Sequence, residues 1–469
     1  MQRRIGSNLG FLLQIAGLLT IFPIAVGLSL GETDAVISLF IACVAFLGAG
    51  FMLNALCERK DLDFRAASVL FVVAFIVMPL IGALPYFYSD PFSSPNVIDR
   101  FTNGYFESIS GFTTTGFSFI AEPETLPRSI LIYRSLTEVM GGVGIVFLLL
   151  AFFQSKRALS YLGVAVGVEE VDKNLKKTYF SVFAIYGIYI LAFTAIFYLL
   201  GFQNLITTGT FVVDTLTGGY SPTAQQLQLY LGVAPQLCII ALMFLGSLNF
   251  AFVYQIITRK FKSIVNQEAI LFFIIIAFGT IVFSAVANTT ALESLFHVVS
   301  MSASVGYSYI PLMSLNSTAI SIILVLMIIG GCAFSMAGGI RVSRIIAFFK
   351  LAGENIQNIF VKENASKPKK TNGDQYTEYC SAAISIVLFI ATLVIFAVIF
   401  TTIGVSFTDA LIEVGSALTT NGYSMGATTL TMGVGYKWLM IAAMTIGRVE
   451  ILSILIALFS LRREKRSSA

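Results

Sequence analysis

The pattern glycine–aromatic–serine occurs four times in this chain, and each copy lies between two long apolar runs. The copies begin at Gly116, Gly219, Gly306 and Gly422. A short amphipathic run precedes each copy, so the repeated unit is an apolar run, a short helix, the pattern and a second apolar run. Four such units predict pseudosymmetry about one axis, with the four patterns meeting at its centre.

A loop of this composition suits a binding site made of backbone carbonyls. Carbonyl oxygens arranged as a ring can replace the water around a small cation such as potassium. The backbone must then alternate between conformations that a side chain resists, so glycine is expected at the critical position. The alternative is an ordinary loop signature, but four copies in equivalent places favour a pore with a filter. The predicted potassium-binding residues are Thr114, Thr115, Gly116, Phe117, Thr217, Gly218, Gly219, Tyr220, Ser304, Val305, Gly306, Tyr307, Thr420, Asn421, Gly422 and Tyr423.

Composition indicates an all-α polytopic membrane protein. The 469 residues are 57% hydrophobic and 12% charged, with a mean hydropathy of +0.87, whereas roughly 25% of residues are charged in soluble proteins. The five cysteines are scattered without a disulfide or metal-binding spacing. The sequence contains no nucleophile–base cluster, Walker A loop or Rossmann fingerprint, so we expect neither an enzyme nor a cofactor bound by this chain. Membrane lipid is the expected surrounding, and no nucleic acid partner is expected.

The apolar runs divide the chain into five parts: an N-terminal helix pair without the pattern, and four pore units. The predicted boundaries are 1–58 for the pair and 59–177, 178–264, 265–377 and 378–469 for the units. Ten runs are long enough to span a membrane, namely 9–30, 35–56, 66–86, 130–153, 179–201, 233–257, 269–287, 318–349, 379–403 and 437–461. Four shorter runs are predicted to be re-entrant pore helices, namely 101–111, 204–216, 291–303 and 407–419.

The distribution of lysine and arginine predicts the orientation. With both termini in the cytoplasm, 24 of the 29 lysines and arginines fall on the cytoplasmic side, as the positive-inside rule expects. The four on the outside are Arg100, Arg128, Arg134 and Lys437. The filters then open toward the outside.

Two features are predicted to form a gate beneath the filter. The run 318–349 is interrupted by a glycine-rich stretch whose candidate gate residues are Gly330, Gly331, Ser335, Gly338 and Gly339. Non-helical backbone at membrane depth lines a cavity or is buried in protein; a tightly packed glycine-rich helix crossing is the alternative. Arg448 lies in the middle of the last apolar run, where it is either an electrostatic barrier to cations or part of a structural ion pair.

Several other polar residues lie in or beside the apolar runs. Glu107, Glu293 and Glu413 lie in or next to the predicted pore helices, where they either attract cations or cap neighbouring backbone. Glu138 is expected to pack against a polar partner, and His297 is expected to be structural.

These motifs resemble the Trk/Ktr/HKT superfamily of potassium transporters, and most closely its bacterial TrkH branch. The resemblance rests on the four patterns, on Gly141-Gly142-Val143-Gly144-Ile145, on the Gly330–Gly339 interruption and on Gly447-Arg448-Val449-Glu450-Ile451. The additional helix pair at 1–56 favours TrkH over the shorter KtrB-type subunits. One departure is Gly218, the additional glycine of the second pattern.

The resemblance implies potassium uptake across the bacterial cytoplasmic (inner) membrane by a homodimer with a separate pore in each protomer. It also implies TrkA-like cytosolic subunits that bind NAD or ATP. A gated, channel-like pore is the favoured hypothesis. The alternative is a secondary transporter that couples potassium to protons or sodium, for which inverted repeats and buried carboxylate relays are typical.

Overall fold

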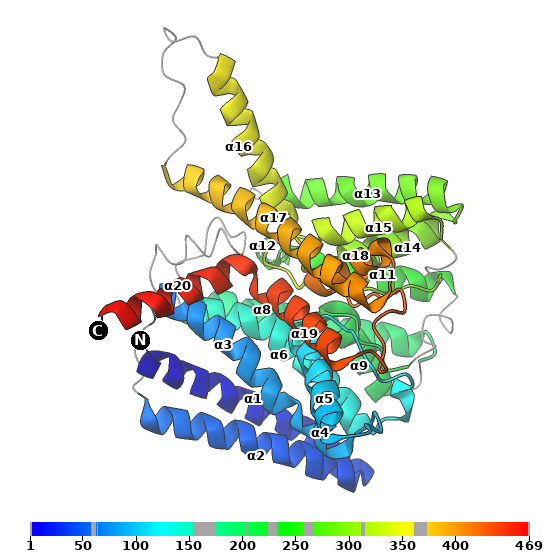
Figure 1. Cartoon of the computed structure of the whole chain (residues 1–469). Coiled ribbons are helices and arrows are strands. Elements are labelled where there is room, and N and C mark those ends of the chain that lie inside the picture. The colour runs from blue at the N-terminus through cyan, green and yellow to red at the C-terminus, as the bar shows by residue number, and fades with distance from the viewer. Residues whose placement is uncertain are drawn as a thin grey trace.

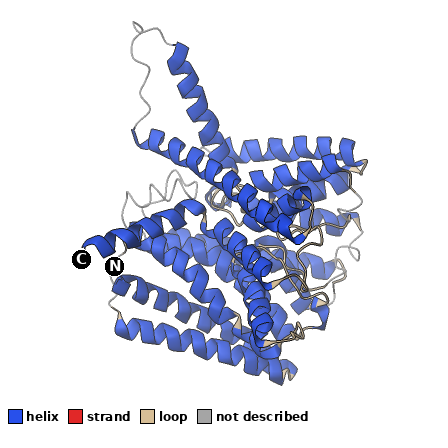
Figure 2. Cartoon of the chain, in the orientation of Figure 1, coloured by secondary structure: helices blue, strands red, loops and turns tan. Residues whose placement is uncertain are grey.

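The computed structural model describes residues 2–57, 62, 64–152, 175–202, 204–223, 232–257, 267–310, 315–360 and 373–467. Within these ranges every regular element is a helix (Figure 2). The N-terminal pair α1 (Gln2–Leu30) and α2 (Thr33–Leu56) lies side by side at one edge of the bundle (Figure 1). A side chain on Gly10 would meet the carbonyl oxygen of Gly50, so small residues permit this close packing.

The remaining helices form four successive units, each with a helix before and after a short helix. The first unit contains α3 (Phe64–Gly82), α4 (Leu84–Ser89), α5 (Val97–Phe112) and α6 (Arg128–Phe152). The second contains α8 (Leu175–Leu199), α9 (Leu205–Thr217), α11 (Val233–Ser247) and α12 (Phe250–Ile257). The third contains α13 (Gln267–Ala287), α14 (Ala291–Ser302), α15 (Ser317–Ile329) and α16 (Val342–Phe360). The fourth contains α17 (Gly373–Phe400), α18 (Phe407–Leu418), α19 (Val434–Val449) and α20 (Ile451–Ser467).

The short helices α5, α9, α14 and α18 have 12 to 16 residues, too few to cross a ~30 Å hydrocarbon core. A side-chain oxygen caps the first turn of each. The capping residues are Asn96, Asn204, Thr290 and Ser406. These caps satisfy free amides at the N-terminus of each helix. At its C-terminus, each helix ends directly before its glycine loop. The carbonyl end of each helix, with its partial negative charge, therefore adjoins the loop.

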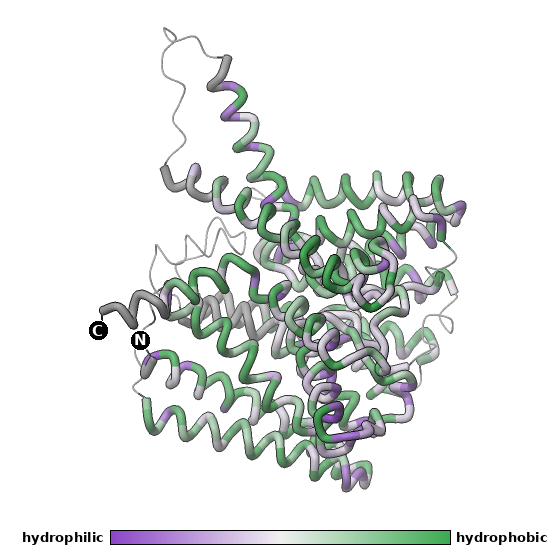
Figure 3. Tube along the Cα trace, in the orientation of Figure 1, coloured by the Kyte–Doolittle hydropathy of each residue, from purple (hydrophilic) through white to green (hydrophobic). Residues whose placement is uncertain are grey.

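Five described helices are long and apolar enough to cross a membrane: Arg4–Leu30, Thr33–Leu56, Arg65–Ser89, Gln267–Ala287 and Tyr379–Ile403. The pair Val434–Val449 and Ile451–Ser460 would add one span, bent by 90°. Large apolar side chains such as Phe22, Leu191 and Phe278 are more than 60% exposed, as expected for surfaces that face lipid. Hydrophobic residues predominate along the long helices (Figure 3). The chain is a multi-pass membrane protein. The full count of ten spans stays a prediction.

Two of the predicted continuous helices are broken, and that part of the prediction was wrong. The run 233–257 ends as a helix at Ser247 and resumes at Phe250. The run 437–461 bends at Glu450, whose φ is +66°. Apolar composition alone cannot show these breaks, because each is stabilised by groups distant in the sequence. The amide of Phe250, for example, donates to the carbonyl of Phe334 (3.0 Å).

Candidate functional site

The four glycine loops form a closed ring. A side chain on the glycine of each loop would meet a backbone carbonyl of the next loop. The pairs, in order, are Gly116 with Gly218, Gly219 with Val305, Gly306 with Asn421 and Gly422 with Thr115. The ring therefore runs through units one, two, three and four and returns to one. Four segments that are about 90 to 120 residues apart lie within contact distance at one place.

The backbone of the loops has the alternation that the sequence predicts. The four pattern glycines have φ between +75° and +83°, a region that glycine occupies at little cost. In three loops the residue two positions earlier also has positive φ; these residues are Thr114, Ser304 and Thr420, with φ of 53°, 57° and 51°. Two left-handed residues separated by one other residue bring successive backbone groups to one side.

The second loop departs from this alternation. Its helix α9 continues to Thr217, and Gly218 has an extended φ of −176°. A side chain at Gly218 would meet the Thr114 carbonyl oxygen at 2.6 Å. The additional glycine is therefore required by close approach of the first loop.

An acid or histidine behind the ring fastens the first, third and fourth loops through the serine that follows the aromatic residue. In the first unit the Glu107 carboxylate accepts from the Ser118 hydroxyl (2.9 Å) and the Phe119 amide (3.3 Å). In the fourth, Glu413 accepts from the Ser424 hydroxyl (2.7 Å) and the Met425 amide (2.8 Å).

The third unit has an imidazole at the corresponding position. His297 Nε2 lies 3.0 Å from the Ser308 hydroxyl, and His297 Nδ1 lies 2.8 Å from the carbonyl of Glu293. Glu107 and Glu413 thus cap loop backbone, whereas Glu293 forms a capping box with Thr290 at the start of α14. The structural role expected for His297 agrees with these contacts.

Arg134 is a residue of this region that sequence reasoning missed. Counting charges assigns it only to the outer side of the membrane; the side chain is 2% exposed and pairs with Glu107, with Arg134 Nη2 2.8 Å from Oε1. Its guanidinium lies over the ring of Tyr220, 4.1 Å from the centroid. The signal was available: a charged residue inside an apolar run faces a buried partner by default. Glu138, on the same helix, accepts from the Thr217 hydroxyl (2.8 Å) and the Tyr220 amide (3.2 Å).

The glycine-rich interruption is a non-helical loop, residues 330–341, and not a helix crossing. Its two ends adopt positive φ, 70° at Gly330 and 81° at Gly339. The amide of Gly338 donates to the Ser304 hydroxyl (3.0 Å), so the loop contacts the third glycine loop.

The middle of the loop is also held. Ser335 accepts from the Ala337 amide (3.2 Å) and donates to the Cys332 carbonyl (2.6 Å). The Ala333 amide donates to the Glu268 carboxylate of α13 (2.5 Å). Gly331 lies against Ser247, at the break between α11 and α12. The loop is thus held by hydrogen bonds of several of its amides to Glu268, Ser304 and the end of α11.

Arg448 lies in the last turn of α19, directly before the bend, and not in the middle of a helix as predicted. It is 7% exposed, and its guanidinium donates to the Met336 carbonyl (3.1 Å) and toward the Gly141 carbonyl (3.5 Å). Arg448 and the loop therefore meet, as the sequence led us to expect. In the part of the chain that the structure describes, Arg448 donates to carbonyl oxygens and not to carboxylates.

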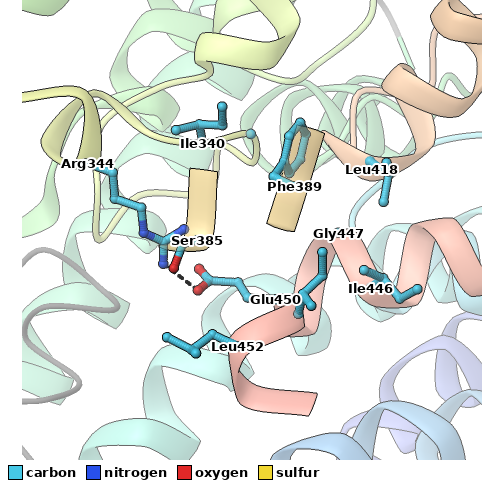
Figure 4. Close-up of a pocket in the computed structure, with 11 residues that line it drawn as sticks. Ile340, Arg344, Ser385, Phe389, Leu418, Ile446, Gly447, Glu450 and Leu452 are labelled. Atoms are coloured by element: carbon cyan, nitrogen blue, oxygen red, sulfur yellow. Dashed lines mark hydrogen bonds and ion pairs between the residues drawn. The ribbon is translucent and has the colours of Figure 1, made fainter. Parts of the chain in front are cut away.

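Glu450 is paired with two other arginines, Arg344 and Arg341, the latter at 3.3 Å. A cavity of about 30 Å³ adjoins the Arg344–Glu450 pair, lined also by Ser385 and Phe389 of α17 (Figure 4). It has room for about one water molecule. The ion pairs therefore join the end of the 330–341 loop to the bend after α19.

Comparison with known proteins identifies the class. The arrangement of helices matches the crystal structure of the potassium transporter TrkH from Vibrio parahaemolyticus, with a TM-score of 0.83, 98% of each chain covered and 21% sequence identity. The chain therefore has the fold of a polytopic membrane transport protein. The model of the TrkH family, described as a cation transport protein, matches residues 33–270 and 263–468. The chain belongs to the TrkH family of cation transport proteins, and it is not an enzyme.

The curated relatives cover nearly the whole chain. The cation transporter MJ1485 of Methanocaldococcus jannaschii is 28% identical over 96% of this chain and 93% of its own length. The Trk system potassium uptake protein TrkG of Escherichia coli K12 is 26% identical over 96% of each. The predicted resemblance is confirmed.

Proposed function

We propose that the chain conducts potassium into the cell through the ring of four glycine loops. The observation that carries the proposal is the ring itself, in which four glycines with positive φ each adjoin a carbonyl of the next loop. Such a ring offers backbone oxygens on several levels to a cation without its water. The carbonyl ends of four short helices add partial negative charge around it. The names of TrkG and the Vibrio TrkH support potassium as the ion.

The 330–341 loop and Arg448 are proposed as the gate. The loop contacts Ser304 of the ring, and its Met336 carbonyl accepts from Arg448. A guanidinium at that level opposes a cation that leaves the ring. Gly330, Gly331, Ser335, Gly338 and Gly339 shape the loop, and Arg448 supplies the charge.

The further parts of the proposal concern location and assembly. We place the chain in the bacterial cytoplasmic membrane with both termini in the cytoplasm, because the excess of lysine and arginine then lies inside. Two copies, each with its own pore, are proposed to assemble with a TrkA-like soluble subunit that binds NAD or ATP. The family membership supports this assembly.

The test is ion selectivity in proteoliposomes. Gly116→Ser and Gly422→Ser should lower the potassium-over-sodium permeability ratio, measured as the reversal potential with the two ions on opposite sides. Gly353→Ser is the matched control, because a Cβ at Gly353 in α16 would meet nothing within 4 Å. An unchanged ratio in both ring variants would remove the filter assignment.

The alternative of a coupled secondary transporter is separable in the same vesicles. Potassium flux is measured while the sodium and proton gradients are varied one at a time. Flux that follows the potassium gradient alone supports a channel-like pore. Uphill potassium movement driven by either other gradient would establish coupling.

A further inference from the structure

The aromatic residue after each glycine fastens its loop to the preceding unit in three of four cases. The Tyr220 hydroxyl donates to the Glu107 carbonyl (2.6 Å), which links unit two to unit one. The Tyr307 hydroxyl donates to the Tyr220 carbonyl (2.6 Å), which links three to two. The Tyr423 side chain hydrogen-bonds the Ser308 side chain, which links four to three. These hydroxyls hold neighbouring loops at fixed separation.

The fourth position, between units one and four, is different. The aromatic residue there is Phe117, which has no hydroxyl. It is 3% exposed and belongs to the same buried apolar cluster as Leu418 and Met444 of unit four. The contact between units one and four, here called the seam, is thus the contact of the ring without a hydrogen bond from the aromatic residue that follows the glycine.

A buried lysine crosses this seam. Lys437, in the first turn of α19, is 2% exposed, and its Nζ donates to the side-chain oxygen of Asn103 on α5 (2.7 Å). The same Nζ lies 5.2 Å from the ring centroid of Phe119, two residues beyond Phe117. Its hydrogen-bond acceptor is a neutral amide, and the charge is also stabilised by the aromatic face and by attraction to Asp99 in the first turn of α5.

Neighbouring aromatic rings reinforce the contact between α5 and α19, which lie side by side (Figure 1). The Trp438 ring is 5.5 Å from Tyr105 and 6.4 Å from Phe101, measured between centroids. Lys437 is the polar member of this contact. A fully buried lysine is costly unless its hydrogen bonds are satisfied, so removing either Lys437 or Asn103 disturbs the seam.

We propose that Lys437 is a positioning residue that closes the ring of glycine loops at the seam where Phe117 provides no hydroxyl. It holds the first loop against unit four and so sets the spacing of the carbonyls without touching the ion. This proposal rests on the proposed function, because it assigns a determinant of selectivity to the same ring.

The experiment compares reversal potentials of reconstituted variants. Lys437→Met keeps the length of the side chain and removes the donor, and it should lower the potassium-over-sodium ratio about fivefold, equivalent to about 1 kcal/mol. Phe117→Tyr in the Lys437→Met background should return the ratio to within about twofold of the original, because a hydroxyl there can reach the unit-four backbone as Tyr307 reaches Tyr220. Lys350→Met, at an exposed lysine on α16, is the matched control.

Gly116→Ser in the same assay separates the two hypotheses. A changed ratio in Gly116→Ser with an unchanged ratio in Lys437→Met overturns the positioning role and leaves the filter in place. Unchanged ratios in both overturn the filter and the positioning role together. If Lys437→Met does not fold, Asn103→Leu removes the acceptor instead. An unchanged ratio in that variant, or no recovery on adding Phe117→Tyr, also overturns the inference.

Discussion

At the scale of single residues, the buried Arg134–Glu107 pair decides how the first loop is held. Both side chains are at most 2% exposed, and Glu107 also accepts hydrogen bonds from the Ser118 hydroxyl and the Phe119 amide. A buried ion pair adds little net stability, because desolvation offsets the attraction. Removing one partner, however, leaves a charge without compensation. The pair therefore acts as a constraint on the position of the loop.

Arg134→Met should destabilise the protein by about 3 kcal/mol, because the Glu107 carboxylate remains buried without its partner. Thermal unfolding in detergent, followed by size-exclusion chromatography, measures the loss. Arg100→Met is the control, since the Arg100–Asp90 pair is partly exposed and such pairs contribute about 1 kcal/mol or less.

The double variant Arg134→Met/Glu107→Gln should recover part of the lost stability, because the remaining amide carries no charge. Equal stability of Arg134→Met and the original protein would show that Glu107 finds another partner.

Sequence reasoning at this scale found the glycines but not what holds them. The glycines repeat at equivalent places, and positive φ is a local property that glycine signals. The contact of Arg134 with Glu107 joins two helices across 27 residues, and charge counting gives only the side of the membrane, not the partner. The same holds for Lys437, whose Nζ is bound to Asn103.

At the scale of elements, the apolar run that follows the glycine loop is broken into two helices in units two, three and four. In unit one the corresponding helix, α6, runs without a break from Arg128 to Phe152. The breaks in units two and three are hydrogen-bonded to each other. The amides of Cys332 and Met336 in the 330–341 loop donate to Ser247 and Gly246, at the end of α11. Apolar periodicity could predict the helices, and the glycine-rich stretch predicted the break in unit three, but the breaks in units two and four could not be predicted, because contacts between units stabilise them.

Arg448→Ala should raise potassium flux. The change removes a positive charge at the loop and frees the Met336 carbonyl from its donor. Each 1.4 kcal/mol removed from the barrier corresponds to about a tenfold higher rate where this step limits flux. Isotopic potassium uptake into proteoliposomes measures the rate.

The potassium-over-sodium ratio is the internal control for Arg448→Ala and should not change, because the glycine ring is not altered. Lower flux in an Arg448→Ala protein of normal stability would assign Arg448 a structural role in holding the loop.

At the scale of the whole molecule, the N-terminal pair packs against the helices of the first unit, and one acidic side chain adds a polar contact. The Glu32 carboxylate, in the turn between α1 and α2, accepts from the amides of Arg128 (2.8 Å) and Ser129 (2.9 Å) at the start of α6. A carboxylate there satisfies free amides and complements the helix dipole. The N-terminal pair therefore contacts α6, which is continuous in the described residues, unlike the corresponding helices of the other three units.

The purified chain alone should conduct potassium at a rate that ATP, ADP and NADH do not change. The chain has no nucleotide-binding motif of its own, and the proposed assembly assigns that role to a soluble subunit. Flux is measured with each nucleotide added on either side, with protein-free vesicles as the blank. A reproducible nucleotide effect on the chain alone would contradict the proposal.

The helix α16 begins where the 330–341 loop ends, packs against α17 and α13, and projects from the bundle (Figure 1). Its 19 residues make a rod about 28 Å long, and the Arg344–Glu450 ion pair fixes it near its inner end. If α16 turns about the Arg344–Glu450 ion pair, the part of the helix beyond the pair is much longer than the part next to the 330–341 loop. A force applied at the far end then acts on the loop more strongly, and the loop moves less than the far end does. In the proposed gate, a partner that displaces the outer end of α16 would therefore move the 330–341 loop by a smaller distance.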